Sequence, residues 1–170
     1  MQENDNLVQL QDENGKDVNF EHLMTIEHEG NYYVVLEATE DTDDCKEGEA
    51  IILKIVRDEE SDEDVYATIE DEAEFNAVCQ DATRDICTCA KAQGMPIEFN
   101  LLGLRSQLSG EGRGYPSPAF WHYAKPYTGD VIIGVDAHDP AHLTDTSLWN
   151  AGMDRLHAMG YTPVDHLRWK

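Results

Sequence analysis

The residues best suited to chemistry are an aspartate and a histidine, Asp136 and His138, in the second half of the chain. They directly follow the apolar run 131–135, which is typical of a strand buried on both faces of a parallel sheet. Alternate residues at a strand end point the same way, so both side chains could reach one metal ion. A carboxylate with an imidazole suits zinc, manganese or iron. The alternative is a surface loop, in which a bare Asp-x-His tripeptide is ordinary.

The segments around this pair alternate between helical and strand patterns. We expect a helix over residues 86–93, a strand over 96–102, a Gly-rich loop over 103–114, a helix starting at Pro116 and an amphipathic helix ending at Gly160. This alternation predicts βα units, in which the carboxyl ends of the strands carry the chemistry.

The first half has a different pattern, that of an acidic antiparallel sheet. We expect strands near residues 7–11, 18–28, 32–36, 50–56 and 65–69, and then a short helix over 71–79. The turn signal Glu29-Gly-Asn makes the second and third strands a hairpin. The fold class predicted for the whole chain is therefore α+β.

Charge separates the two halves. The 170 residues carry 35 acidic and 12 basic side chains, a net charge of -23. Residues 1–83 hold 26 of the acidic and 4 of the basic ones, whereas residues 84–170 hold 9 and 8. A shift this sharp predicts a boundary near residue 83, with domains 1–83 and 84–170.

The composition also excludes some classes of partner and location. A strongly acidic chain lacks the Lys and Arg needed to bind phosphate backbones or anionic membranes, so we expect neither nucleic acid nor membrane as a partner. The apolar runs are too short to span a bilayer, and the start of the chain lacks a secretory signal pattern. The four cysteines show no disulfide framework. We expect a cytoplasmic protein with reduced thiols.

The first half resembles the YrzB-like family, short acidic bacterial proteins of unknown function. The resemblance rests on residues 12–20, the hairpin 29–36, the strand 51–56 and the segment 69–75, and it spans nearly all of residues 7–82. It implies a small α+β domain and brings no catalytic motif.

The second half resembles the C-terminal part of histidinol phosphatases of the polymerase-and-histidinol-phosphatase superfamily. The resemblance rests on residues 97–105, 115–117, 120–121 and 132–140, in that order. It implies the end of a distorted (β/α)₇ barrel that hydrolyses L-histidinol phosphate with a cluster of divalent metals. By this resemblance Asp136 and His138 are metal ligands, and Arg105 is a candidate to hold the substrate phosphate through its bidentate fork.

Most of that barrel has no counterpart in this sequence. The family's N-terminal His-x-His motif is absent, and two ligands cannot hold a multi-metal cluster, since catalytic sites usually need at least three. Glu98, on the neighbouring predicted strand, is a candidate third ligand or simply a strand residue. Strands normally buried in a barrel would need covering by the sheet of the acidic domain, by a second copy of the chain or by a partner chain that carries the missing barrel part.

Three hypotheses follow from these observations. The second half is a remnant without turnover, fused to an acidic domain. Alternatively, it is a metal-dependent phosphatase whose site is completed by an oligomer or a partner. In the third hypothesis, the chain is a non-enzymatic acidic interaction module.

Overall fold

A computed structural model describes residues 6–11, 15–42, 45–58, 63–110 and 115–166 of the chain. Its contacts divide the molecule into two compact units, Met1–Asp81 and Ala82–Lys170. Antiparallel sheet and helices are both present, so the fold class is α+β, as predicted. Within the residues described, no helix is both long enough and apolar enough to cross a membrane.

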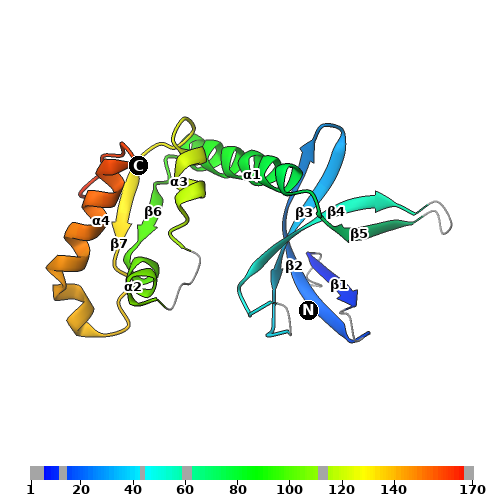
Figure 1. Cartoon of the computed structure of the whole chain (residues 1–170), viewed down its shortest axis with the longest axis horizontal. Coiled ribbons are helices and arrows are strands. Elements are labelled where there is room, and N and C mark those ends of the chain that lie inside the picture. The colour runs from blue at the N-terminus through cyan, green and yellow to red at the C-terminus, as the bar shows by residue number, and fades with distance from the viewer. Residues whose placement is uncertain (1–5, 12–14, 43–44, 59–62, 111–114, 167–170) are drawn as a thin grey trace. The chain divides into compact units, whose positions relative to one another are not determined.

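The first unit is built on one curled antiparallel sheet of five strands in sequential order (Figure 1). The strands are β1 Leu7–Gln11, β2 Asp17–His28, β3 Asn31–Ala38, β4 Ala50–Arg57 and β5 Asp64–Thr68. Each pairs with the next along the chain, so β1 and β5 form the two edges. All five strands were predicted from their alternating or β-branched patterns.

The tight hairpin between β2 and β3 depends on two residues in left-handed backbone conformations. Glu29 has φ 49° and Gly30 has φ 78°. A two-residue turn with positive φ at both positions matches the twist of the flanking strands, and glycine adopts it without steric cost. The hairpin places Tyr33 opposite Ile26, and this register decides which side chains share a face.

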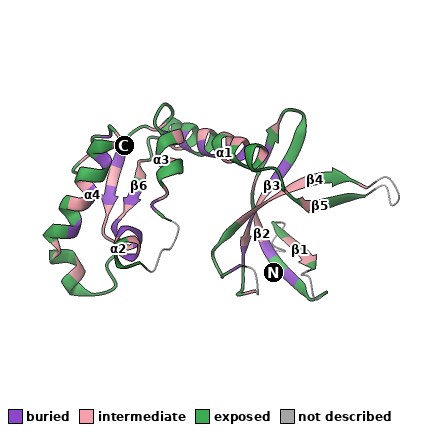
Figure 2. Cartoon of the chain, viewed as in Figure 1, coloured by how far each residue is buried: buried purple, intermediate pink, exposed green. Residues whose placement is uncertain are grey.

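The two faces of this sheet are buried in different ways. One face carries an apolar cluster whose fully buried members include Val18, Val34 and Leu36, all on β2 and β3 (Figure 2). Tyr33, next to Val34, points to the opposite face because side chains alternate along a strand. There its hydroxyl donates to Glu74 of the following helix, so that helix covers this second face.

The following helix is longer than the sequence patterns suggest. Two separate helices were expected, over 71–79 and 86–93, and that prediction was wrong, because α1 runs without interruption over Glu72–Gln93. The side chain of Asp71 accepts a 2.8 Å hydrogen bond from the backbone of Glu74, which caps the start of the helix. Gly94, with φ 69°, ends it in the left-handed conformation. No Gly or Pro lies between these ends to break it.

The second unit places helices around a two-stranded parallel sheet. Its elements are β6 Ile97–Asn100, α2 Leu101–Ser109, α3 Pro118–Ala124, β7 Val131–Gly134, the 3₁₀ helix η1 Pro140–Thr144 and α4 Thr146–Ala158. β6 and β7 run parallel, and Val164 adds a parallel bridge to Ile132 of β7. The core contains Phe99 of β6, Trp121 of α3, Leu156 of α4 and Tyr161 of the segment that follows α4.

Two predictions for this unit need correction. Residues 103–114 were expected to form a loop, but α2 occupies their first part; residues 111–114 lie outside the described structure. The Asn100 side chain caps α2 and Gly110 ends it with φ 83°, so local capping outweighs the Gly-rich composition. The helix expected from Pro116 begins at Pro118, because Ser117 is its cap.

Candidate functional site at the carboxyl ends of β6 and β7

The candidate site forms where the two parallel strands of the second unit end. The register places Glu98 opposite Ile132 and Asn100 opposite Gly134. Asp136 follows two residues beyond the end of β7. Because parallel strands end at the same edge, polar residues that lie far apart in sequence come together here. Three of the four candidate residues named from the sequence lie at this edge: Glu98, Asp136 and His138.

The amide group of Asn100 connects the two strands. Its Nδ2 donates to Oε1 of Glu98 at 3.0 Å and to Oδ2 of Asp136 at 3.3 Å. Its Oδ1 accepts from the backbone nitrogen of Gly103 at 3.0 Å, which caps α2. One amide therefore orients two carboxylates and starts a helix, using the donor and acceptor ends of the same side chain.

Asp136 and His138 contact each other directly. Nε2 of His138 lies 3.3 Å from Oδ1 of Asp136. The His138 side chain is 74% exposed and that of Asp136 is 42% exposed, so both are open to solvent. Asp136 also adopts φ 45°, a left-handed conformation that is uncommon for residues other than glycine, although aspartate tolerates it better than most.

The Glu98 carboxyl group lies against the neighbouring strand, beside Gly134. A Cβ atom added at Gly134 would overlap the carboxyl group of Glu98. The absence of a side chain at Gly134 thus leaves the space that the Glu98 carboxylate occupies. The φ of Gly134 is not unusual, and the group that approaches it is the exposed end of a flexible side chain, so a larger residue at this position would displace the Glu98 carboxyl group.

These residues do not complete a catalytic metal centre. Throughout the described ranges, no group of three or more His, Cys, Asp or Glu side chains is arranged to hold a metal ion. Asp136 and His138 supply one carboxylate and one imidazole, and the Glu98 carboxylate is connected to Asp136 only through Asn100. A metal-activated water needs more ligands than this pair provides.

Arg105, the candidate for holding phosphate, has an acidic partner elsewhere in the unit. Its Nη2 donates to Oδ2 of Asp145 at 3.2 Å, an ion pair between α2 and the cap of α4. Hydrogen bonds from the Ser147 hydroxyl and the Leu148 backbone, followed by the charge of Arg105, lower the pKa of Asp145. A phosphate group would have to compete with this carboxylate for the guanidinium.

Asn100 is the residue of this site that the sequence analysis missed. An available signal was its place directly before the apolar run that opens α2, because Asn is a favoured helix cap. Its contact with Asp136, 36 positions away, had no signal in the sequence.

The comparisons with known proteins concern the first unit. Residues 13–84 match the family described as "Protein of unknown function (DUF1292)". A UPF0473 protein of Alkaliphilus oremlandii is 44% identical over 78 residues, which cover 46% of this chain and 86% of that protein. The chain belongs to the UPF0473 family.

Two further UPF0473 proteins agree with this assignment. The protein of Caldicellulosiruptor saccharolyticus is 40% identical over 75 residues, which are 44% of this chain and 73% of that protein. That of Heliobacterium modesticaldum is 40% identical over 77 residues, 45% of this chain and 81% of that protein. The UPF0473 domain thus corresponds to the predicted YrzB-like domain of unknown function, and no solved structure matches the chain.

Proposed function

We propose that the chain joins a UPF0473 domain to the C-terminal end of a barrel related to metal-dependent histidinol phosphatases, and that it has no phosphatase turnover by itself. This assignment of the second unit rests on the sequence resemblance of residues 84–170. The proposal also places the chain in the cytoplasm, because its four cysteines are thiols.

The observation that carries the proposal is the cluster at the carboxyl ends of β6 and β7. Glu98, Asp136 and His138 meet where a parallel α/β enzyme places its chemistry. The same cluster falls short of a metal-holding group of three, and the Asn100 amide occupies the position between its two carboxylates. An inherited metal site that has lost its other ligands accounts both for the position of this cluster and for its lack of a third ligand.

A second candidate function is phosphatase activity completed in trans, by a second copy or by a partner chain. One observation favours it. β7 has neighbours on both sides, β6 and the bridge at Val164, whereas β6 pairs only with β7 among the residues described. The free side of β6 offers unpaired backbone groups next to Glu98 and Asn100, where a further strand could add.

The test is phosphate release from L-histidinol phosphate by the purified full-length chain, with manganese or zinc added. The chain is compared with the double variant Asp136→Asn/His138→Ala. A matched control, Asp154→Asn/His157→Ala, makes the same chemical changes at exposed positions of α4. We expect the same background rate for all three proteins.

Release by the wild type that persists in the control and disappears in the Asp136/His138 variant would contradict the proposal. In that case the rate is measured against protein concentration. A specific activity that rises steeply with concentration would support completion by a second copy.

A further inference from the structure

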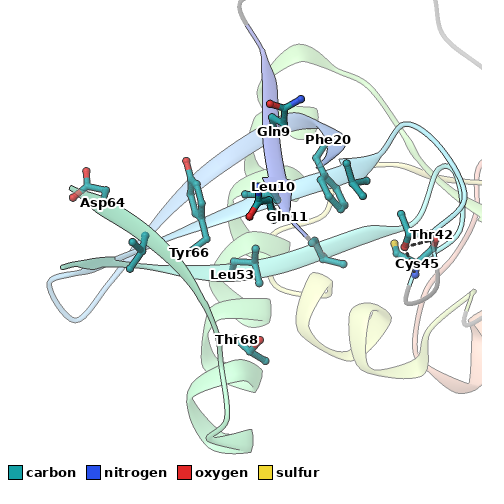
Figure 3. A pocket seen from close by; sticks show the side chains of 13 residues that line it. Gln9, Leu10, Gln11, Phe20, Thr42, Cys45, Leu53, Asp64, Tyr66 and Thr68 are labelled. Carbon is teal, nitrogen blue, oxygen red and sulfur yellow. Dashed lines mark hydrogen bonds between the residues drawn. The ribbon is translucent and has the colours of Figure 1, made fainter. Parts of the chain in front are cut away.

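A hollow on the UPF0473 domain points to a binding surface that is separate from the candidate site. It has a volume of about 610 Å³ and lies on the face of the sheet that carries the apolar cluster (Figure 3). We propose that this hollow binds an extended peptide of alternating basic and apolar residues, which adds to the sheet as an extra strand. This proposal concerns the first unit and does not depend on the ancestry of the second.

The two edges of the same sheet border the hollow. Gln9, Leu10 and Gln11 of β1 line it, and so do Asp64, Val65, Tyr66 and Thr68 of β5. These strands are first and last in the sheet order, with three strands between them. The curl of the sheet therefore brings both edges to one opening, and a guest strand placed there would lie beside an edge.

The lining divides into an apolar floor and a polar rim. Leu10, Val18, Phe20, Ile51 and Leu53 contribute the floor, and Leu10, Ile51 and Leu53 are only partly buried. Gln9, Gln11 and Asp64 contribute polar groups from the edge strands. On the other face of the sheet, α1 covers Tyr33, whereas no described helix covers this one. Apolar surface left partly open in this way is typical of a binding groove.

The edge strands supply the hydrogen bonds that an extended guest needs. β1 and β5 each pair on one side only among the described residues, so alternate backbone N–H and C=O groups point away from the sheet. Each strand has five residues. Val65 and Tyr66 on β5 are 43% and 39% exposed. Strand addition satisfies the backbone groups and lets alternate guest side chains reach the floor.

Charge determines which peptide this surface favours. Residues 1–83 carry 26 acidic and 4 basic side chains. Basic side chains of the domain already contact carboxylates: Lys46 contacts Asp41, Lys54 contacts Glu74, and Arg57 contacts Asp64. The remaining carboxylates give the domain a strongly negative field, which attracts Lys or Arg side chains and repels acidic ones. A guest peptide with apolar residues toward the floor and basic residues toward solvent matches both the apolar floor of the hollow and the negative charge of the domain.

The test is fluorescence anisotropy of labelled peptides of about eight residues, long enough to span an edge strand, with the full-length chain. The first probe alternates lysine and valine, the second alternates lysine and serine, and the third alternates glutamate and valine. We expect the lysine–valine peptide to bind at least about tenfold more tightly than the other two. Only this peptide has both apolar side chains for the floor of the hollow and positive charge that the negative field of the domain attracts. Its affinity should fall when salt rises from about 50 to about 500 mM.

A matched pair of variants locates the binding surface. Tyr66→Ala removes an exposed tyrosine from the hollow, and Tyr32→Ala removes a 51% exposed tyrosine from β3, outside the hollow. Both side chains are exposed, so both variants should fold, which circular dichroism checks. We expect Tyr66→Ala to weaken binding of the lysine–valine peptide about fivefold or more and Tyr32→Ala to leave it unchanged.

Strand addition has its own test. Methylating the backbone nitrogens of alternate peptide residues removes donors without changing charge, and one of the two alternating sets should abolish binding. Equal binding of the lysine–serine peptide would overturn the proposal, since it would indicate charge attraction alone. Equal effects of the two tyrosine variants, or full binding by both methylated peptides, would also overturn it. None of these outcomes bears on phosphate release, so the two proposals fail separately.

Discussion

The hydroxyl of Tyr33 donates a 2.5 Å hydrogen bond to Oε1 of Glu74, which joins the centre of the sheet to the first turn of α1. Nζ of Lys54 contacts the same carboxylate oxygen at 2.8 Å. Tyr33 is fully buried, so its hydroxyl depends on this partner. Lys54 and Tyr33, in that order, lower the pKa of Glu74 by hydrogen bonding to its charged form.

The first prediction concerns alkaline pH. Burial, and then the Glu74 carboxylate, raise the pKa of Tyr33 to about 12 from 10.0. A raised pKa in the folded state gives stability that is complete below pH 10 and is lost as pH rises toward 12. Tyr33→Phe should therefore make urea-unfolding free energy less dependent on pH in this window. It should also cost roughly 1–2 kcal/mol at neutral pH, through the lost hydrogen bond.

The control for that experiment is Tyr32→Phe, at an exposed tyrosine on the same strand. In this variant the unfolding free energy should depend on pH as it does in the wild type. Some slope will remain in both variants, because burial also raises the pKa of Tyr161 in the second unit to about 12. Identical slopes in Tyr33→Phe and wild type would contradict the assignment.

The second prediction separates the two roles of Asp145. Its Oδ1 caps α4 by accepting from Leu148, and its Oδ2 accepts from Arg105. Asp145→Ser keeps a capping oxygen and removes the ion pair, whereas Asp145→Ala removes both. We expect the melting temperature to fall in the order wild type, Ser, Ala. A serine variant as unstable as the alanine variant would assign the whole effect to the Arg105 pair.

The third prediction uses the space beside Glu98. Gly134→Ala places a methyl group where the exposed, flexible end of Glu98 lies, so the carboxyl group moves aside and the second unit should lose no more than about 1 kcal/mol. The double variant Glu98→Ala/Gly134→Ala removes the overlapping group and should recover much of the loss. Urea unfolding of the four proteins in this cycle measures the coupling. If the changes in unfolding free energy of the two single variants simply add in the double variant, the methyl group that Gly134→Ala adds does not meet the Glu98 carboxyl group.

The fourth prediction tests the core of the second unit. Leu156 of α4 is fully buried in its cluster, and Leu156→Ala should cost about 2–5 kcal/mol through lost burial and a cavity. The matched control, Leu108→Ala, alters a leucine that is 59% exposed and should stay within about 0.5 kcal/mol of wild type. Tryptophan fluorescence is the probe, because all three tryptophans lie after residue 82. A large loss of stability in Leu108→Ala would show that Leu108 makes a contact that its exposure does not reveal.

Local patterns in the sequence predicted much of the fold. The five strands of the first unit, the parallel strand Val131–Gly134 and the last helix each have a short-range signal in alternation, β-branching or periodicity. The continuity of α1 was missed, because the change of composition near residue 83 was taken as a break in structure as well. The start of α2 was missed because its first two residues, Leu101 and Leu102, were assigned to the strand before it, which ends at Asn100.

Only part of the candidate site could be predicted from the sequence. Asp136 and His138 are two residues apart, so their proximity followed from the backbone alone. Asn100 reaches Asp136 across 36 positions, and this contact depends on the parallel register of β6 with β7. Register is set by the match between the buried faces of two strands and by the turn that joins them. β6 and β7 are parallel and separated by α2 and α3, so no tight turn fixes their register and neither segment specifies it by itself.

The sequence by itself determined the family of the first unit, its extreme charge and the positions of its strands, because these are properties of composition and short-range spacing. Tertiary structure alone decided that β1 and β5 border one hollow and that Asn100 orients Glu98 and Asp136. The physical reason is that twist accumulates from strand to strand, so the approach of two edges is a property of the complete sheet.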